Sequence, residues 1–354
     1  MEDTEYHKSR VIRREKSYKT DGLPSRYVFV LTNKCNLSCS FCFQDRKKLP
    51  NSMGFNDWVY LSNKLPRGSH VTLTGGEPLA FKNFDNILKH IAERHTVNII
   101  CNGVLLTEKV VDLLCAIQNV RVLSISVDTI GNVNRGVTTE QYAKMKRVLE
   151  YFHSRRRELN SEIILDTKTV VTDQDSYCLF DIYKHCIETL KADTHSFQFL
   201  KGSPIQHSDK MFEYEAIFDE PTPYVYQTVS TIAHEFEKVR DYCMKKGTRC
   251  YSHPKFIDFS DKNQNYEQII NERINKFQFE PSDYQACKAP WESVHINADG
   301  AVFPCLAVSI GDARQHDDMN ELFNQPVAKN FRNELRNCGT FQACHRCGYL
   351  EPRS

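Results

Sequence analysis

Three cysteines near the N-terminus constrain this chain more than any other feature of its sequence. Cys35, Cys39 and Cys42 form a C-x-x-x-C-x-x-C run that directly follows an apolar, strand-like segment at residues 27–31. A loop this short can place three thiolates around one face of a cubane iron–sulfur cluster, which leaves one iron without a protein ligand. An iron with an open position is reactive, by the same logic that separates catalytic from structural zinc. The spacing therefore predicts a catalytic iron–sulfur cluster.

The same cysteines are also compatible with zinc. Cys39 and Cys42 form one C-x-x-C pair, and Cys344 and Cys347 form a second pair near the C-terminus, as in a zinc ribbon. On that reading the chain is a non-enzymatic zinc-binding module. Zinc has no use for Cys35, however, and a second motif downstream favours the cluster.

The second motif is T-G-G-E-P at residues 74–78, at the end of another strand-like run. Gly75 and Gly76 have no Cβ, so the backbone there can come close to a ligand. Glu77 supplies a carboxylate for a cationic amine. Because this motif follows the cysteine run by one strand–helix interval, it favours cluster chemistry.

Together these motifs resemble the signature of the radical S-adenosylmethionine (radical SAM) superfamily. The resemblance implies that the amino and carboxylate groups of SAM chelate the vacant iron and that the aromatic residue before Cys42 lies against the adenine. The residues at positions where the family binds SAM are Phe41, Gly75, Gly76, Glu77, Asn102, Ser126, Asp128 and Arg135. Helix capping by Asp128 and an exposed position for Arg135 are the alternatives for that pair.

The pattern of apolar runs predicts an α/β fold. Short apolar runs alternate with longer amphipathic ones, which is typical of βα units around a parallel sheet. We expect strands near 26–32, 70–74, 96–101, 121–127, 162–171 and 195–200, and helices near 55–65, 83–94, 107–118, 138–157 and 175–191. Asn56 and Thr107 fit helix N-caps. Six such units fit an open, partial (β/α)6 barrel, which the family resemblance also implies, with function at the carboxyl ends of the strands.

Charged residues in the fifth predicted strand are candidates to face the inside of this barrel. Period-two alternation puts Asp166 and Lys168 on one face. Charges in mid-strand are costly unless they are paired or point into a cavity. A salt bridge at the barrel rim is the alternative for this pair. Gln198, His195 and Lys201, around the sixth strand, are candidates of the same kind.

A second group of cysteines begins at Cys287. Asp299-Gly300 lies between two alternating apolar runs and predicts a hairpin, which would bring Cys287 toward Cys305. With a later C-x-x-C pair, these thiolates would close a site for zinc or for a [4Fe–4S] cluster.

This region resembles the SPASM/twitch extension of radical SAM enzymes, in which Gly-x-x-x-x-Cys precedes a C-x-x-C pair. A full SPASM domain has more cysteines than the five found here, so the resemblance implies a small α+β domain with one auxiliary [4Fe–4S] cluster. The expected ligands are Cys287, Cys305, Cys344 and Cys347, with Cys338 as the substitute.

Composition restricts the partners and the location. Lysine and arginine total 46 against 45 acidic residues, so no net field favours nucleic acid as a partner. No apolar run approaches a membrane span, and the charged start is not a signal peptide. Fourteen cysteines without an export signal indicate a reducing cytoplasm. We expect an N-terminal arm at 1–24, the barrel at 25–202, a partly helical segment that completes the barrel at 203–285 and the auxiliary-cluster domain at 286–354.

The resemblance implies an oxidoreductase or maturase that cleaves SAM reductively to a 5′-deoxyadenosyl radical and abstracts a hydrogen atom from its substrate. Two substrate classes stay open. The auxiliary cluster and the 203–285 segment favour a ribosomally made peptide that is cross-linked, oxidised or epimerised, which is our preferred reading. The short cluster region and the lack of an obvious leader-peptide-binding domain of ~80 residues favour a small alcohol, amino sugar or amino acid that is dehydrogenated or epimerised. The expected protein partner is a one-electron reductant such as flavodoxin or ferredoxin.

Overall fold

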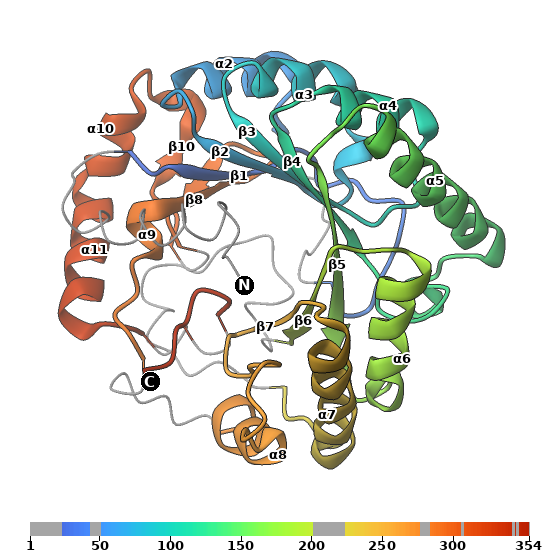
Figure 1. Cartoon of the computed structure of the whole chain (residues 1–354). Coiled ribbons are helices and arrows are strands. Elements are labelled where there is room, and N and C mark those ends of the chain that lie inside the picture. The colour runs from blue at the N-terminus through green and yellow to red at the C-terminus, as the bar shows by residue number, and fades with distance from the viewer. Residues whose placement is uncertain are drawn as a thin grey trace.

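The computed structural model describes residues 23–42, 51–200, 224–276, 284–305, 308–341, 344 and 347–353. In these residues ten strands form one sheet, in the order β10-β9-β8-β1-β2-β3-β4-β5-β6-β7. The sheet is curved, and α2 to α7 lie along its outer side (Figure 1). The α/β barrel that the sequence predicts is confirmed.

Seven of these strands form the barrel. They are β1 (Arg26–Val30), β2 (His70–Thr74), β3 (Thr96–Cys101), β4 (Val120–Ser126), β5 (Ile164–Val171), β6 (Thr194–Phe199) and β7 (Cys250–His253). Each pairs in parallel with the next. The first six lie where the sequence predicts strands, and β7 is an addition that extends the barrel beyond the expected six units.

Helices connect these strands as expected for βα units. They are α2 (Phe55–Lys64), α3 (Phe84–Ala92), α4 (Glu108–Ala116), α5 (Thr139–Glu158), α6 (Leu179–Lys184) and α7 (Val229–Lys246), with the short turns η1 (Pro78–Ala80), η2 (Val133–Arg135), η3 (Ser176–Cys178) and η4 (His185–Thr189). Thr107 caps α4 as predicted, because its hydroxyl accepts the backbone N–H of Val110 at 3.3 Å. The prediction for Asn56 is wrong: Gly54 is the N-cap of α2, and its N–H donates to the Asp57 carboxylate at 2.7 Å.

The two faces of the barrel sheet differ in character. On the outer face, apolar residues such as Phe29, Leu123 and Leu165 are fully buried under the helices. Phe29, for example, packs on Trp58 of α2 with 4.8 Å between ring centroids. On the inner face, adjacent strands place polar residues side by side, namely Ser124, Ser126, Asp166, Lys168, Thr194, Ser196 and Gln198. The outer face is therefore apolar, and the inner face carries a polar patch where β4, β5 and β6 lie side by side.

The C-terminal region continues the same sheet. After α8 (Tyr266–Ile269) and η6 (Ile270–Ile274) come α9 (Ala289–Glu292), β8 (Ser293–Ile296), β9 (Ala301–Phe303), β10 (Gly311–Asp312), η8 (Ala313–Gln315), α10 (Met319–Asn324) and α11 (Pro326–Cys338). β8 and β9 form the predicted antiparallel hairpin, and Gly300 in its turn has φ +89°, a conformation that favours glycine. β8 also pairs in parallel with β1, so this region is joined directly to the barrel.

The end of the chain reaches both sides of the barrel. The hydroxyl of Tyr349 lies 3.1 Å from Ser293 Oγ on β8 and also contacts Arg26 of β1. Glu351 accepts from Lys255, just after β7, at 2.9 Å. No helix in the described part of the chain is long and apolar enough to cross a membrane.

Candidate iron–sulfur and SAM site

The three N-terminal cysteines lie in the loop that follows β1, at the carboxyl ends of the parallel strands. Cys35, Cys39 and Cys42 are all partly exposed. The loop turns between the last two, where the Cys42 N–H donates to the Cys39 carbonyl at 3.2 Å. Cys35 Sγ accepts the backbone N–H of Leu37 at 3.4 Å. This is the end of a barrel at which parallel strands direct their loops to a common site.

Gly75 and Gly76 allow this cysteine loop to lie directly against the end of β2. A Cβ on Gly75 would be 2.5 Å from the Thr32 carbonyl oxygen, and one on Gly76 would be 2.4 Å from that of Lys34. The N–H groups of Gly76 and Glu77 donate to those same two oxygens, each at 2.8 Å. In the structure, the space that these two glycines leave is therefore occupied by the backbone of the cysteine loop next to Cys35.

Glu77 joins the ends of β2 and β3. It is fully buried, and its carboxylate accepts the N–H of Asn102 at 2.7 Å and that of Leu79 at 3.1 Å. Burial raises the pKa of Glu77 to about 7, although these hydrogen bonds and the Arg135 charge act in the opposite direction. Its role toward the SAM amino group stays a prediction.

Asn102 lies beside the cysteine loop. Its Nδ2 is 3.8 Å from Cys35 Sγ and donates to Asn36 Oδ1 at 2.8 Å. Its Oδ1 accepts the N–H of Val104 at 2.9 Å. The side chain expected to lie beside SAM therefore also supports the cysteine loop.

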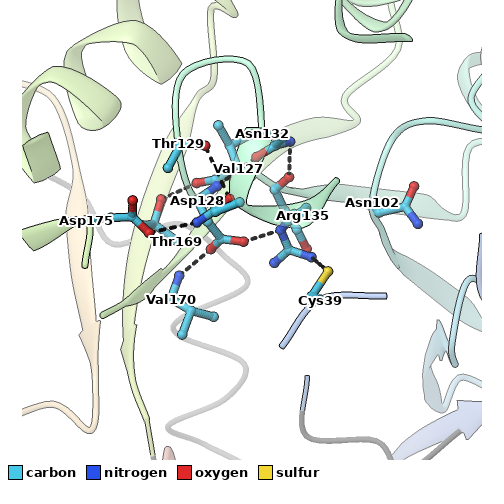
Figure 2. A network of polar contacts seen from close by, with 12 residues as sticks. Cys39, Asn102, Val127, Asp128, Thr129, Asn132, Arg135, Thr169, Val170 and Asp175 are labelled. Atoms are coloured by element: carbon cyan, nitrogen blue, oxygen red, sulfur yellow. Dashed lines mark hydrogen bonds and ion pairs between the residues drawn. The ribbon is translucent and has the colours of Figure 1, made fainter. Parts of the chain in front are cut away.

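Asp128 and Arg135 form an ion pair at the carboxyl end of β4 (Figure 2). Asp128 is fully buried and accepts the N–H of Val170 at 2.6 Å, while the Arg135 side chain is 12% exposed. Arg135 Nη1 lies 3.6 Å from Cys39 Sγ. Neither alternative for this pair holds, since Asp128 caps no helix and Arg135 is not a surface residue.

The charge state of Arg135 follows from these neighbours. Burial by itself would lower the pKa of Arg135, but the charges of Asp128 and Cys39 raise it above its ordinary value. The guanidinium carbon also lies 5.3 Å from the centroid of the Phe41 ring. A charged arginine is thus held between a carboxylate, a thiol and an aromatic ring.

Asn132, which was not predicted from the sequence, organises this turn. Its Oδ1 accepts the N–H of Asp128 at 2.9 Å, and its Nδ2 donates to the Ser126 carbonyl at 3.0 Å. It is fully buried with φ 51°, a left-handed conformation that asparagine tolerates better than most residues. The Gly131-Asn132 dipeptide was the available signal.

Asp166 and Lys168 lie on the inner face of β5, as the alternation predicts, and they form a salt bridge with each other, which was the alternative expected for this pair. Lys168 Nζ lies 2.7 Å from Asp166 Oδ2 and 3.4 Å from Ser196 Oγ. Asp166 also accepts from Ser124 and Thr194, each at 2.8 Å. Burial would raise the pKa of Asp166, but Lys168 and the two hydroxyls hold it below its ordinary value. Asp166 is therefore ionised at neutral pH despite its burial.

The candidates on the sixth strand divide between the two faces. Gln198 is on the inner face, in register with Val170. The expectation for His195 is wrong, because it lies on the outer face and packs against Tyr183 with 5.4 Å between ring centroids. Burial lowers the pKa of His195 to about 3. Lys201 lies outside the described residues.

The structure describes all four C-terminal cysteines expected as ligands. Burial raises the pKa of the Cys344 thiol well above its ordinary value, and the charges of Cys287, Cys305 and Cys347 raise it further. Among the described residues no three or more side chains form a ready-made metal site, so this ligand set stays a prediction. Cys338, the expected substitute, is the exposed last residue of α11.

The residues present fit iron–sulfur clusters and SAM. Three partly exposed thiols in one loop, with N–H donors directed at two of their sulfurs, are the donor set for a cluster with one open iron. The four C-terminal thiols expected as ligands, whose charges act on Cys344, would suit a closed cluster. Phe41, Ser126 and Arg135 would hold SAM beside the first group, as predicted from the motifs.

Two family models match the chain in the same two places. The model of the radical SAM superfamily matches residues 29–174, and that of the SPASM iron–sulfur cluster-binding domain matches residues 287–348. The chain therefore contains a radical SAM domain, followed by a C-terminal SPASM domain. These two domains imply SAM, a SAM-binding [4Fe–4S] cluster and auxiliary iron–sulfur binding.

Two curated relatives come from Bacillus subtilis (strain 168). The sporulation killing factor maturation protein SkfB is 35% identical over 116 residues, which is 32% of this chain and 28% of SkfB. The antilisterial bacteriocin subtilosin biosynthesis protein AlbA is 21% identical over 315 residues, which is 86% of this chain and 60% of AlbA. The chain thus spans less than two thirds of the length of either relative.

Among solved structures, Streptococcus suis SuiB bound to its precursor peptide SuiA has a similar fold. It superposes with a TM-score of 0.61 at 18% identity and covers 96% of this chain and 74% of SuiB. At 18% identity this similarity shows a shared fold and nothing more. The shared fold consists of the barrel and the C-terminal domain.

Proposed function

We propose that this chain matures a ribosomally synthesised peptide by radical SAM chemistry. When bound, the reduced cluster and SAM supply a 5′-deoxyadenosyl radical, which abstracts a hydrogen atom from the peptide. The observation that carries the proposal is the pair of cysteine groups, one of three thiols at the barrel mouth and one of four in the C-terminal domain. The names of SkfB and AlbA, and the peptide complex of SuiB, support a peptide as substrate.

In this proposal the residues at the barrel mouth bind the cofactor. Arg135, with donors left over from Asp128 and Cys39, suits the SAM carboxylate. Phe41 offers an aromatic face for the adenine, and Ser126 offers a hydroxyl from the inner face of β4. Glu77 would balance a cationic amine near the Gly75-Gly76 turn.

The polar interior is proposed to bind the peptide. Lys168 has three N–H donors, and its contacts in the described residues, with Asp166 and Ser196, use two of them. The third can bind a carbonyl or carboxylate oxygen of the substrate. Asp166 keeps the ammonium oriented, because Ser124 and Thr194 fix the carboxylate in turn. Gln198, further along the inner face, is a second candidate contact.

Labelled substrate tests the proposal. Precursor peptides encoded beside this gene would be made with deuterium at single residue types and turned over anaerobically with SAM and dithionite. We expect deuterium in the released 5′-deoxyadenosine for one peptide and a mass change in that peptide. Label transfer from a small alcohol, amino sugar or amino acid, with none from any peptide, would replace the peptide reading by the small-molecule one.

A further inference from the structure

Arg135 is directed at a cysteine of the SAM-binding group as well as at a carboxylate. Its Nε donates to Asp128 and its Nη1 lies 3.6 Å from Cys39 Sγ (Figure 2). The two contacts use adjacent edges of one rigid, planar guanidinium. When Nε of Arg135 donates to Asp128, the position of Nη1 opposite Cys39 is therefore fixed as well.

The turn that carries Arg135 is held firmly enough for this contact to be a fixed feature. Arg135 ends η2, its N–H donates to the Asn132 carbonyl at 3.0 Å, and Gly136 closes the turn with φ +76°. Asn132 is itself bonded on both sides, and Asp128 is anchored to β5 through Val170. The position of the Arg135 guanidinium is consequently set by contacts with residues at the ends of β4 and β5.

A cation that donates to a cysteine sulfur acts on the redox equilibrium of a cluster bound there. Reduction adds one negative charge to the cluster, so a positive donor at the sulfur stabilises the reduced form more than the oxidised form. We propose that Arg135 donates a hydrogen bond to the Cys39 thiolate and thereby raises the reduction potential of the cluster held by Cys35, Cys39 and Cys42. This inference rests on the proposed function only in assuming that the cluster is present.

Binding of SAM is compatible with this role. A guanidinium has five N–H donors, and the contacts with Asp128 and Cys39 involve only Nε and Nη1. In the described part of the chain the structure assigns no contact to Nη2, so its two N–H groups can serve the SAM carboxylate. Arg135 would then act on the cofactor and on the cluster from one position.

The potential of the first cluster tests this inference without any peptide. Reconstituted wild-type protein and Arg135→Gln would be titrated with dithionite under EPR, and the signal of the first cluster would be identified as the one missing from protein in which Cys35, Cys39 and Cys42 are changed to alanine. Only part of a charge-assisted hydrogen bond distinguishes the two redox states, so we expect the reduction equilibrium to change by about 4- to 10-fold. This corresponds to a lowering of about 35–59 mV for one electron.

Two further variants and an internal standard make the result specific. Arg155→Gln removes an arginine of similar kind, paired with Asp112 at 2.7 Å at the far end of α5, and should leave the potential unchanged. Arg135→Lys keeps the charge but not the planar fork, so its potential should lie between those of wild type and Arg135→Gln. The reduction potential of the auxiliary cluster, measured in the same samples, should not change.

The outcomes separate this inference from the proposed function. An unchanged potential in Arg135→Gln, with iron content preserved, would overturn the inference alone. If Arg135→Gln loses the first cluster, the decision passes to Arg135→Lys, where a lower potential supports the role and an unchanged one refutes it. Absence of the first cluster from the wild-type protein would instead refute the proposed function.

Discussion

Replacing Gly76 by alanine places one methyl group where the cysteine loop meets the barrel. The added Cβ would lie 2.4 Å from the Lys34 carbonyl oxygen, 2.7 Å from its carbon and 2.8 Å from the Asn33 oxygen. All three atoms are backbone, so no side-chain rotation relieves the contact. The loop must move away from β2, and with it the neighbouring Cys35.

The cost follows from two effects. Forcing a methyl group into a packed position costs about 1–3 kcal/mol. Separation of the loop also weakens two backbone hydrogen bonds, from Gly76 to Thr32 and from Glu77 to Lys34, each 2.8 Å long and each worth about 1 kcal/mol. The sum is roughly 3–5 kcal/mol, which at about 1.3 °C per kcal/mol for a chain of this length corresponds to a fall of roughly 4–7 °C in thermal midpoint.

The assay compares Gly76→Ala with Gly54→Ala after anaerobic reconstitution. Gly54 has φ −92° and its nearest atom to an added Cβ is a side-chain oxygen at 3.7 Å, so alanine there should be tolerated. For Gly76→Ala we expect the lower thermal midpoint, the loss of about half of the iron and little 5′-deoxyadenosine. A Gly76→Ala protein with the wild-type midpoint and full iron content would refute the packing argument.

Three other predictions concern separate parts of the molecule. Cys344→Ala should lower iron from about eight to about four per chain and leave substrate-free SAM cleavage intact, and loss of both clusters would contradict two independent sites. Lys168→Met should reduce peptide modification roughly 10- to 100-fold and leave substrate-free release of 5′-deoxyadenosine unchanged. The double variant Asp166→Asn/Lys168→Met leaves no unpaired buried charge and therefore controls for misfolding. Full peptide modification by this double variant would show that Lys168 does not bind the substrate. His195, whose pKa burial lowers to about 3, stays neutral when folded and binds a proton on unfolding below its ordinary pKa of 6.5. Its contribution is therefore present above pH 6.5 and lost on acidification, by about 1.4 kcal/mol between pH 7.5 and 5.5; thermal melts should show a smaller acid-induced loss for His195→Asn, and an equal loss would contradict the assignment.

Much of the barrel could be predicted because its local patterns are strong. The run of β5 alternates cleanly, and the structure confirms that Asp166 and Lys168 share the inner face. The same logic was available for His195: Phe197 and Phe199 are apolar at alternate positions, which places His195 with them on the helix-covered face. The face on which His195 lies is set by the alternation along β6 and not by the polarity of histidine.

The pairing of strands that lie far apart in the chain could not be predicted from local sequence patterns. β7 has only the four residues C-Y-S-H, too short and too polar to stand out as a strand, and it exists because β6 offers a paired edge. The hairpin at Gly300 was predicted from its turn, but nothing local indicates that β8 joins β1. Both additions come from tertiary contacts, which override weak local preference.

At the site, spacing carried more information than individual residue types. The C-terminal ligand set was predicted from the hairpin and the C-x-x-C pair; the structure confirms the hairpin, and the set of four ligands stays a prediction. The partners of Arg135 could not be predicted, because the contact with Cys39 joins residues 96 positions apart in the chain. Asn132 was missed for a related reason, since its importance lies in a left-handed turn.

The most direct test of the central claim is SAM cleavage by a chain without its N-terminal cysteines. Cys35, Cys39 and Cys42 would be changed together to alanine, and 5′-deoxyadenosine and iron would be measured after anaerobic reconstitution with SAM and dithionite. We predict no 5′-deoxyadenosine and about half of the wild-type iron, retained in the C-terminal site. Release of 5′-deoxyadenosine at the wild-type rate by this triple variant would contradict the account.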